Sequence, residues 1–374
     1  MTKSGIDFKI KLSLISLKKA KKFLRGVHMA KAVKLADIAV KLGVSTVTVS
    51  KALSGQKGVS EPMREKIKQL ADEMGYKPPS AMKQQRQAKS YNIGVLVSDR
   101  YLDKYDSFYW KMYQCVATKA VQKDCFTMLE VVTYENEMEL TLPKIVLEHK
   151  VDGIVIVGKL SGEYLKELKE RCNIPTVYLD FYDEHVIEDS VISNSYYGSY
   201  LLTNYLFEQG HRKIAYVGTL LITASITDRY FGYAKSMMEH GVQIPKEWVI
   251  PDRDMKYGLI NFDGKLENYK DQPTAYVCNS DLTASFLIKK LNEQGLSVPE
   301  DVSVVGFDNY LYPGLCEIGI TTYEVDMKEM ARKALHILIK KMNGEHYRQG
   351  ISIVEGHMVH KDSVRSLEGG SESE

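Results

Sequence analysis

The chain has 374 residues, of which 44% are hydrophobic and 26% are charged, a composition typical of a globular protein with two or three domains. No apolar run approaches the roughly 18 residues that a membrane-spanning helix needs. The net charge is only +2, but residues 1–90 carry 20 Lys and Arg against 6 Asp and Glu, whereas the remaining 284 carry 30 against 42. A basic head on an acidic body is expected when one end of a chain meets a polyanion.

The five cysteines indicate neither a disulfide framework nor a metal site. They form no C-x-x-C pair and join no histidine cluster of zinc type; they are Cys115, Cys125, Cys172, Cys278 and Cys316. We therefore expect buried or free thiols in a reducing cytosol, with no metal and no cofactor.

Residues 1–28 include the basic, partly amphipathic stretch "FKIKLSLISLKKAKKFLRGVH". A secretory signal fits poorly, because its apolar part is short, is broken by serines and precedes no small-residue cleavage site. A membrane-surface helix is an alternative. The favoured hypothesis is that Met29 is the true start and that residues 1–28 are a non-native extension.

Residues 29–77 are predicted to form a helix-turn-helix domain. In "KLADIAVKLGVSTVTVSKALSG" (34–55), apolar residues recur at helical spacing on both sides of Gly43, which suits the left-handed end of a helix. Ser45 can cap the second helix. In "VSEPMREKIKQLADEMGY" (59–76), we expect Ser60 to cap a third helix and Pro62 to lie in its first turn. Three such helices can bind DNA or simply pack together, and the pattern alone leaves both open.

Residues 91–365 are predicted to form an α/β core with two lobes. Short apolar runs rich in β-branched residues alternate with helical patterns, as expected for two doubly wound parallel sheets. We expect strands at 92–98, 126–132, 151–158, 174–180, 190–194, 212–218, 273–279 and 301–308, and helices at 195–209, 226–240, 281–294 and 326–343. Residues 366–374 are expected to be a disordered tail.

Polar residues at the strand ends are candidates for ligand binding, because ligands of such sheets bind beyond the carboxyl ends of the strands. Asp180, Asp281 and Asp308 each follow a strand, and Arg229 begins a helix. A guanidinium and a carboxylate suit the adjacent hydroxyls of a sugar or another polar ring. The alternatives are a turn or cap role for Asp308 and a surface ion pair for Arg229.

Residues 101–116 hold six aromatic side chains in sixteen positions. Aromatic faces stack on sugar rings and purines, but Tyr109, Trp110 and Tyr113 could equally pack against a dimer partner.

The head closely resembles the lactose-repressor (LacI) family of bacterial transcription regulators, whose pattern L-x-D-(V/I)-A-x-x-(A/L)-G-V-S-x-x-T-V-S is nearly complete here. The resemblance extends through "VDGIVIVG", "NSYYGSYLLTNYLFEQGHRKIAYVG", "PTAYVCNSDLTAS" and "DVSVVGFDN", and covers about residues 33–365. The same core resembles periplasmic sugar-binding proteins, which lack the DNA-binding head.

By this resemblance the second head helix lies in the DNA major groove. The base-contacting residues are then Thr46, Val47 and Lys51, while Ser45, Thr48 and Ser50 have hydroxyls suited to phosphate. Val47 has an alternative role as a core residue.

Residues 78–90 occupy the place of the family's hinge helix, which folds on DNA and wedges a leucine into the minor groove. Gln85 stands in the leucine's position, so either Met82 replaces it as the wedge or the kink is weaker. Lys83 and Arg86 would face phosphates. Without the resemblance, this polar, basic stretch is also compatible with a plain linker.

In the body, the resemblance implies that Arg229 and Asp308 contact the ligand, with Asp281 next, and that Phe108 and Tyr109 cap the cleft. Arg253 falls where some family members place an aromatic residue, which would favour an anionic ligand. Asn194 matches a family turn and is either structural or ligand-facing. Asp180 is the remaining candidate for ligand binding.

The expected function is a homodimeric repressor that binds a pseudo-palindromic operator and is controlled by a carbohydrate-derived effector between the lobes. A solute-binding protein and a regulator without ligand are the alternatives. An enzyme is not expected, because the sequence has no nucleophile elbow, phosphate loop, dinucleotide fingerprint or metal-ligand set. The effector, the operator and the direction of control are not specified by the sequence.

Overall fold

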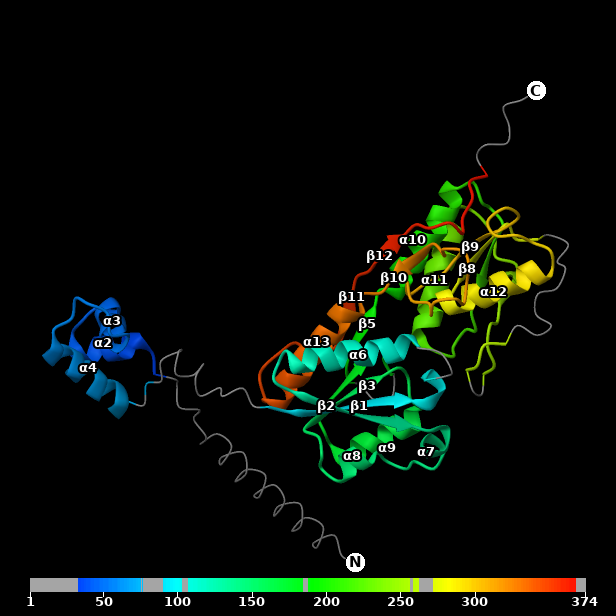
Figure 1. Ribbon diagram of the computed structural model, residues 1–374. Helices are drawn as coiled ribbons and strands as arrows, with labels where there is room; N and C mark the ends of the chain where they lie inside the picture. The colour runs from blue at the N-terminus through cyan, green and yellow to red at the C-terminus, as the bar shows by residue number, and fades with distance from the viewer. Residues whose placement is uncertain are drawn as a thin grey trace, which may run out of the picture. The chain divides into compact units, whose positions relative to one another are not determined.

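The structure is a computed structural model that describes residues 33–74, 76, 90–102, 107–183, 188–255, 258–261 and 272–367. The chain divides into two units, the first ending at Gln87 and the second beginning at Ala88 (Figure 1). Residues 1–28 and the hinge candidates Met82, Lys83, Gln85 and Arg86 lie outside the described residues.

The first unit is a small three-helix domain, here called the head, with helices α2 (Leu35–Leu42), α3 (Thr46–Leu53) and α4 (Glu61–Glu73). Gly43 ends α2 in the left-handed conformation, with φ of 64°, as its position in the sequence predicts. The Ser45 hydroxyl accepts the Thr48 N–H at 3.1 Å and so caps α3. The core consists of Ile38, Ala39, Val49, Ala52, Ile67 and Ala71.

The start of α4 differs from the expectation. Ser60 occupies the residue before the helix, but its side chain makes no capping hydrogen bond within the described head. The guanidinium of Arg64 instead ties α4 to the end of α3, because Nη1 donates to the Ala52 carbonyl at 3.1 Å and Nη2 to that of Gln56 at 3.0 Å. Sequence periodicity does not reveal this link.

The second unit, here called the body, contains two parallel sheets, as predicted. In the described part of the N-terminal lobe, six parallel strands lie in the order β11-β5-β4-β3-β1-β2. Their bounds are β1 (Asn92–Ser98), β2 (Phe126–Val132), β3 (Gly153–Val157), β4 (Thr176–Leu179), β5 (Asp189–Ser193) and β11 (Ile351–Val354). The first five agree with the predicted strands to within a few residues, whereas β11 was not predicted.

Helices cover both faces of this sheet, so its strands are apolar on both sides. Helices α6 (Phe108–Val121) and α13 (Met327–Met342) lie side by side on one face and bury Ile93, Val95 and Val97 of β1 (Figure 1). Leu96 belongs to the separate core on the opposite face. There lie the helices α7 (Tyr134–Met138), α8 (Lys144–Leu147) and α9 (Gly162–Cys172). The short helix η1 (Asp99–Tyr101) follows β1.

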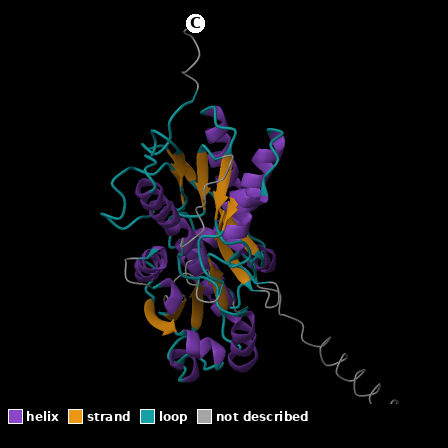
Figure 2. Cartoon of the chain, turned by 90° about the vertical axis from the view of Figure 1, so that its right-hand side faces the viewer, coloured by secondary structure: helices purple, strands orange, loops and turns teal. Residues whose placement is uncertain are grey.

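The C-terminal lobe has a four-stranded parallel sheet in the order β7-β6-β8-β9 among the described residues. Its strands are β6 (Ile214–Val217), β7 (Val249–Ile250), β8 (Ala275–Cys278) and β9 (Ser303–Val305), and its helices are α10 (Ser195–Glu208), α11 (Ala224–Glu239), η2 (Lys246–Trp248) and α12 (Asp281–Glu293). A Cβ atom at Gly232 would lie 2.0 Å from the Tyr196 carbonyl oxygen, so the close packing of α10 on α11 requires glycine there. Figure 2 shows the strands of the two lobes as separate groups with helices beside each.

The described chain passes between the lobes at three places, because strands of the N-terminal sheet are followed or preceded by elements of the other lobe. These crossovers are β5 to α10, β10 (Thr322–Glu324) to α13, and β11 to β12 (His357–Val359). Strands β10 and β12 pair antiparallel beside the C-terminal lobe. Leu367 donates its N–H to the Gln209 carbonyl at 2.8 Å, so the prediction that the tail is disordered from residue 366 is wrong at its start.

Candidate functional site

The exposed face of α3 is the candidate surface of the head. Four exposed side chains lie on this helix: Thr46, Val47, Ser50 and Lys51. Val47 is 59% exposed, whereas Val49 is fully buried, so the core is built without Val47. The alternative role of Val47 as a core residue is therefore wrong.

The hydroxyls of Ser45 and Thr48 already have a structural role. They lie 2.9 Å apart, and the Ser45 oxygen also accepts the Thr48 N–H. Each hydroxyl keeps further hydrogen-bonding capacity, because a hydroxyl has one donor and two acceptor positions.

The candidate ligand residues of the body meet between the lobes. Tyr109 and Asp180 belong to the N-terminal lobe, on α6 and directly after β4; Arg229, Arg253, Asp281 and Asp308 belong to the C-terminal lobe. The Tyr109 hydroxyl donates to Asp180 Oδ2 at 3.1 Å. Burial is the main cause that raises the pKa of Asp308; the charge of Arg229 opposes this rise, and the charge of Asp180, from the other lobe, adds to it. The structure thus places Tyr109 and Asp180 of one lobe close enough to Arg229 and Asp308 of the other for their charges to interact, and their role in ligand binding stays a prediction.

Arg229 is a buried organiser of this site. Its Nη2 lies 3.1 Å from Asp308 Oδ1, its Nε donates to the Ser195 hydroxyl at 3.3 Å, and its Nη1 donates to the Asn279 carbonyl. Its guanidinium carbon lies 3.8 Å from the centre of the Phe307 ring, a cation–π contact. A surface ion pair, the alternative considered from the sequence, is wrong because only 6% of this side chain is exposed.

Burial is the main cause of the pKa shifts of the three carboxyl groups Asp180, Asp281 and Asp308. It raises the pKa of Asp180 to about 6 and that of Asp308 to about 7, although the positive charge of Arg229 opposes both shifts. Burial also raises the pKa of Asp281 well above its ordinary value. The Asp308 Oδ1 atom faces the Arg229 guanidinium, whereas the Asp281 Oδ1 atom accepts no well-aligned hydrogen bond from the residues that the structure describes.

Arg253 is already paired. Its Nη2 lies 2.6 Å from Asp252 Oδ2, and its Nε donates to both oxygens of that carboxylate. Asn279 and Thr283 also donate to Asp252 Oδ2, at 2.7 and 2.8 Å. Burial favours the neutral acid, but the charge and donors of Arg253 lower the pKa of Asp252 to about 2. Asp252 therefore offsets much of the Arg253 charge, although this charge still opposes the burial that raises the pKa of Asp308.

The aromatic candidates line the same region. Phe108 and Tyr109 are the first residues of α6, with ring centres 5.3 Å apart and perpendicular planes. Tyr310, from the C-terminal lobe, lies 6.4 Å from Phe108. Tyr101, whose ring centre lies 4.5 Å from Tyr109, was not singled out from the sequence, where only its place in the aromatic-rich stretch could have indicated it.

Asn194 lies at the crossover from β5 to α10 and has structural partners. Its Oδ1 accepts the Tyr197 N–H at 3.2 Å, and its Nδ2 donates to the two Glu355 oxygens at 2.9 and 3.0 Å. Glu355 lies in the crossover from β11 to β12. The Asn194–Glu355 pair therefore joins two of the three crossovers between the lobes, which together form the inter-lobe hinge. These contacts favour a structural role for Asn194 over a ligand-facing one, the two roles that the sequence allowed.

Both units of the chain match known protein families. Residues 34–79 match the family model described as bacterial regulatory proteins, lacI family, and residues 203–364 match the periplasmic binding protein-like domain. The order of the two matches is that of the head and the body. The chain belongs to the lacI family of bacterial regulatory proteins.

Curated relatives of this lacI-family chain are transcriptional repressors. The HTH-type transcriptional repressor PurR of Vibrio vulnificus is 27% identical over 335 residues, covering 88% of this chain and 98% of its own. The repressor CytR of Escherichia coli K12 is 26% identical over 334 residues, covering 88% and 96%. These relatives are regulators of transcription and not enzymes, in agreement with the expectation for this chain.

Solved structures share the fold of this lacI-family chain. A lac repressor dimer bound to operator and the anti-inducer ONPF is 24% identical with a TM-score of 0.62, over 90% of this chain and 100% of that one. A complex of the transcriptional regulator CelR with cellobiose is 22% identical with a TM-score of 0.63, over 88% and 99%. The predicted head and two-lobed body are thus confirmed.

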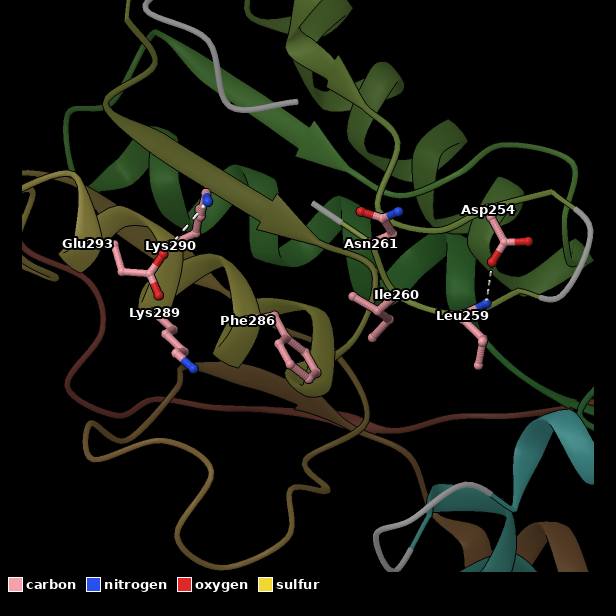
Figure 3. A pocket seen from close by; sticks show the side chains of 8 residues that line it. All are labelled: Asp254, Leu259, Ile260, Asn261, Phe286, Lys289, Lys290 and Glu293. Carbon is pink, nitrogen blue, oxygen red and sulfur yellow. Dashed lines mark hydrogen bonds and ion pairs between the residues drawn. The ribbon is translucent and has the colours of Figure 1, made fainter. Parts of the chain in front are cut away.

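Two surface hollows of the described body are lined by none of Asp180, Arg229 and Asp308. One, of about 570 Å³, is lined by Phe286, Lys289, Lys290 and Glu293 of α12 and by Asp254, Leu259, Ile260 and Asn261 (Figure 3). The other, of about 720 Å³, reaches Arg253. Among the described residues, no group of three or more His, Cys, Asp or Glu side chains is arranged to hold a metal ion, and no helix has the length and apolarity needed to cross a bilayer.

Proposed function

We propose that this DNA-binding regulator is a homodimeric repressor of the bacterial cytoplasm, which binds a pseudo-palindromic operator and responds to a carbohydrate-derived effector held between its lobes. The exposure of Val47 beside Thr46, Ser50 and Lys51 carries the DNA part of the proposal. These side chains are free to meet base edges, while the helix N-terminus supplies backbone donors for phosphate.

The base contacts differ in kind. Thr46 can bond a base edge or touch a thymine methyl, whereas Val47 offers apolar contact only. Lys51 can approach the guanine O6 and N7 acceptors as a point charge, without the fixed fork of arginine. Two heads on a dimer would each contact one half-site, so the symmetry of the operator would follow that of the protein.

The effector part of the proposal is supported by the meeting of Asp180, Arg229 and Asp308 between the lobes. Charged and polar groups gathered at one place suit a ligand with several hydroxyls. Two solved proteins of this fold are described with sugars, cellobiose in one and D-xylulofuranose in the other. A ligand that prefers one angle between the lobes would shift the spacing of the heads.

Operator binding is tested by fluorescence anisotropy with the DNA that precedes the chain's own gene and its neighbours. Lys51→Ala is expected to weaken binding to the best fragment by about tenfold to a hundredfold, as loss of a specific base contact does. Lys68→Ala removes the same charge from the exposed face of α4 and is the matched control. Equal losses for both variants, or equal losses on specific and non-specific DNA, would contradict base recognition by Lys51.

Effector control is tested by adding a panel of sugars and sugar derivatives to the operator complex and to the free protein in thermal unfolding. One or more should raise the unfolding temperature and change operator affinity, and the sign of that change shows whether the ligand induces or co-represses. A panel that stabilises nothing and leaves DNA binding unchanged would favour the regulator that takes no ligand.

A further inference from the structure

Arg64 is the only arginine among the head residues that the structure describes, and its side chain differs from those of the lysines around it. The lysines of this part of the head are all exposed, whereas only 11% of the Arg64 side chain is. A guanidinium that is largely withdrawn from solvent is poorly placed to meet phosphates. Its hydrogen bonds lie within the head instead.

The Arg64 guanidinium supplies donors that the end of α3 lacks, because the last carbonyl groups of a helix have no intrahelical partner. The Gln56 N–H donates to the Lys51 carbonyl at 3.0 Å, and the Ala52 carbonyl accepts from Arg64 Nη1 at 3.1 Å. Nη2 donates to the Gln56 carbonyl at 3.0 Å, so one planar group holds carbonyls on both sides of the turn at Gly55. Its positive charge also suits the C-terminal end of a helix.

This link fixes the direction of α3, which is a short helix. It has eight residues, and helices of this length depend on tertiary contacts for their position. Val49 and Ala52 hold one side of α3 in the core, but apolar packing is non-directional. Two hydrogen bonds from a planar fork do have fixed directions, and they join α3 to α4 through Arg64.

We propose that Arg64 is a positioning residue for base recognition: by holding the end of α3, it sets the direction in which Val47 and Lys51 leave the helix. This inference rests on the proposed DNA-binding function and adds a residue that does not itself touch DNA. A recognition contact requires its side chain to be placed to within about 0.5 Å. Val47 is short and stiff and cannot compensate for a tilt of α3, so the base that it touches should be the most sensitive.

The test uses Arg64→Lys in the full chain, because lysine keeps the charge but is a point charge on a flexible stem without the fork. Fluorescence anisotropy measures affinity for the best operator fragment and for a series of fragments in which each base pair of one half-site is replaced in turn. Val47→Ala and Lys51→Ala, measured on the same series, identify the base pairs that these two side chains distinguish.

Arg64→Lys should weaken discrimination at these same base pairs by about tenfold in total and should leave affinity for non-specific DNA within about twofold of the wild type. Discrimination is a ratio of two affinities measured on one preparation, so an unfolded fraction of the head cancels from it. A purely structural role would lower both affinities equally. In the Val47→Ala, Lys51→Ala double variant, adding Arg64→Lys should have little further effect, because the side chains that Arg64 positions have been removed.

Direct contact of Arg64 with a phosphate predicts a different result. Arg64→Gln removes the charge, and Lys66→Gln removes the same charge from an exposed position on α4. Both variants should give the same dependence of affinity on salt concentration. A slope of log affinity against log salt that falls by about one in Arg64→Gln alone, and returns in Arg64→Lys, would assign Arg64 to a phosphate and overturn the inference.

Hydrogen exchange of the α3 amides in the full chain shows whether the head of each variant is folded. If Arg64→Lys has no protected α3 amides, Arg64→Gln is measured by the same ratios. A head unfolded in both variants, or base preferences equal to those of the wild type, overturns the inference and leaves the proposed operator binding standing. If Val47→Ala and Lys51→Ala change no base preference, base recognition by α3 fails and the role of Arg64 falls with it.

Discussion

Arg229 Nη2 lies 3.1 Å from Asp308 Oδ1, and no more than about a tenth of either side chain is exposed. The same guanidinium bonds Ser195 and the Asn279 carbonyl and stacks on Phe307. Arg229 therefore connects α11 to the starts of α10 and α12 as well as to the strand end that carries Asp308. The residue is part of the architecture of the C-terminal lobe and also a candidate ligand contact.

Arg229→Gln is expected to lower the free energy of unfolding of the body by about 3–5 kcal/mol, because it leaves a buried carboxylate without its cation. Urea unfolding monitored by tryptophan fluorescence measures the loss. Arg171→Gln is the control, since Arg171 is paired with Glu167 at 3.2 Å on the surface of α9 and should change stability by less than about 0.5 kcal/mol. Similar losses in the two variants would show that burial does not determine the strength of the Arg229 pair.

The stability of the unliganded body should fall as the pH rises from about 4 to 7. Asp180 and Asp308 have folded-state pKa values near 6 and 7, above their ordinary value of 3.8, so the folded state binds more protons than the unfolded state in this window. Each group contributes at most about 1.4 kcal/mol per pH unit. His211, whose pKa is lowered mainly by burial, acts in the opposite direction near pH 6.

The contribution of the carboxylates is isolated by comparison with Asp308→Asn. Urea unfolding at intervals from pH 4.5 to 8 should give a less negative slope of stability against pH in the variant than in the wild type, because one raised carboxyl has been removed. His211 and the other titrating groups are common to both proteins. Parallel slopes would mean that Asp308 does not titrate in this range.

Val47 and Val49 form a matched pair of substitutions, because they lie two residues apart on α3 and only Val49 is buried. Val49→Ala should destabilise the head by about 2 kcal/mol through lost packing. Val47→Ala should change its stability by less than about 0.5 kcal/mol and should weaken operator binding instead. Hydrogen exchange of the α3 amides in the full chain measures stability, and fluorescence anisotropy measures binding. Loss of stability in Val47→Ala would contradict the exposed position of that side chain.

Much of the fold was predictable because its signals are local. The alternation of apolar strands with helices predicted both parallel sheets, and Gly43 with Ser45 predicted the turn of the head. Strand β11 was missed because it is short, has two exposed residues and joins the N-terminal sheet from a distant part of the chain. Its assignment depends on pairing with β5, which no local pattern records.

The sequence indicated which residues of the candidate site lie near one another. It did not indicate which of their charges are already paired. The positions of Asp180, Arg229 and Asp308 at strand ends and a helix start indicated a shared site. The neutralisation of Arg253 by Asp252 could not be inferred, because adjacent residues in a sequence often point to opposite sides of a strand. Asn279 and Thr283, which complete that network, follow β8 and lie in α12, and they become neighbours of Arg253 only through the pairing of the strands.

Substitutions at Asn194 can distinguish a structural role in the inter-lobe hinge from a role in ligand binding. Asn194→Asp keeps the oxygen that caps α10 but removes the two hydrogen bonds to Glu355 and places two carboxylates side by side. It should lower stability by about 1 kcal/mol at neutral pH, since the pair is partly exposed. The double variant Asn194→Asp with Glu355→Gln should recover most of this loss, because the glutamine amide can donate to the new carboxylate. Calorimetry with the tightest-binding sugar should give unchanged affinity in the double variant; a persistent loss of affinity there would assign Asn194 to the ligand instead of the hinge.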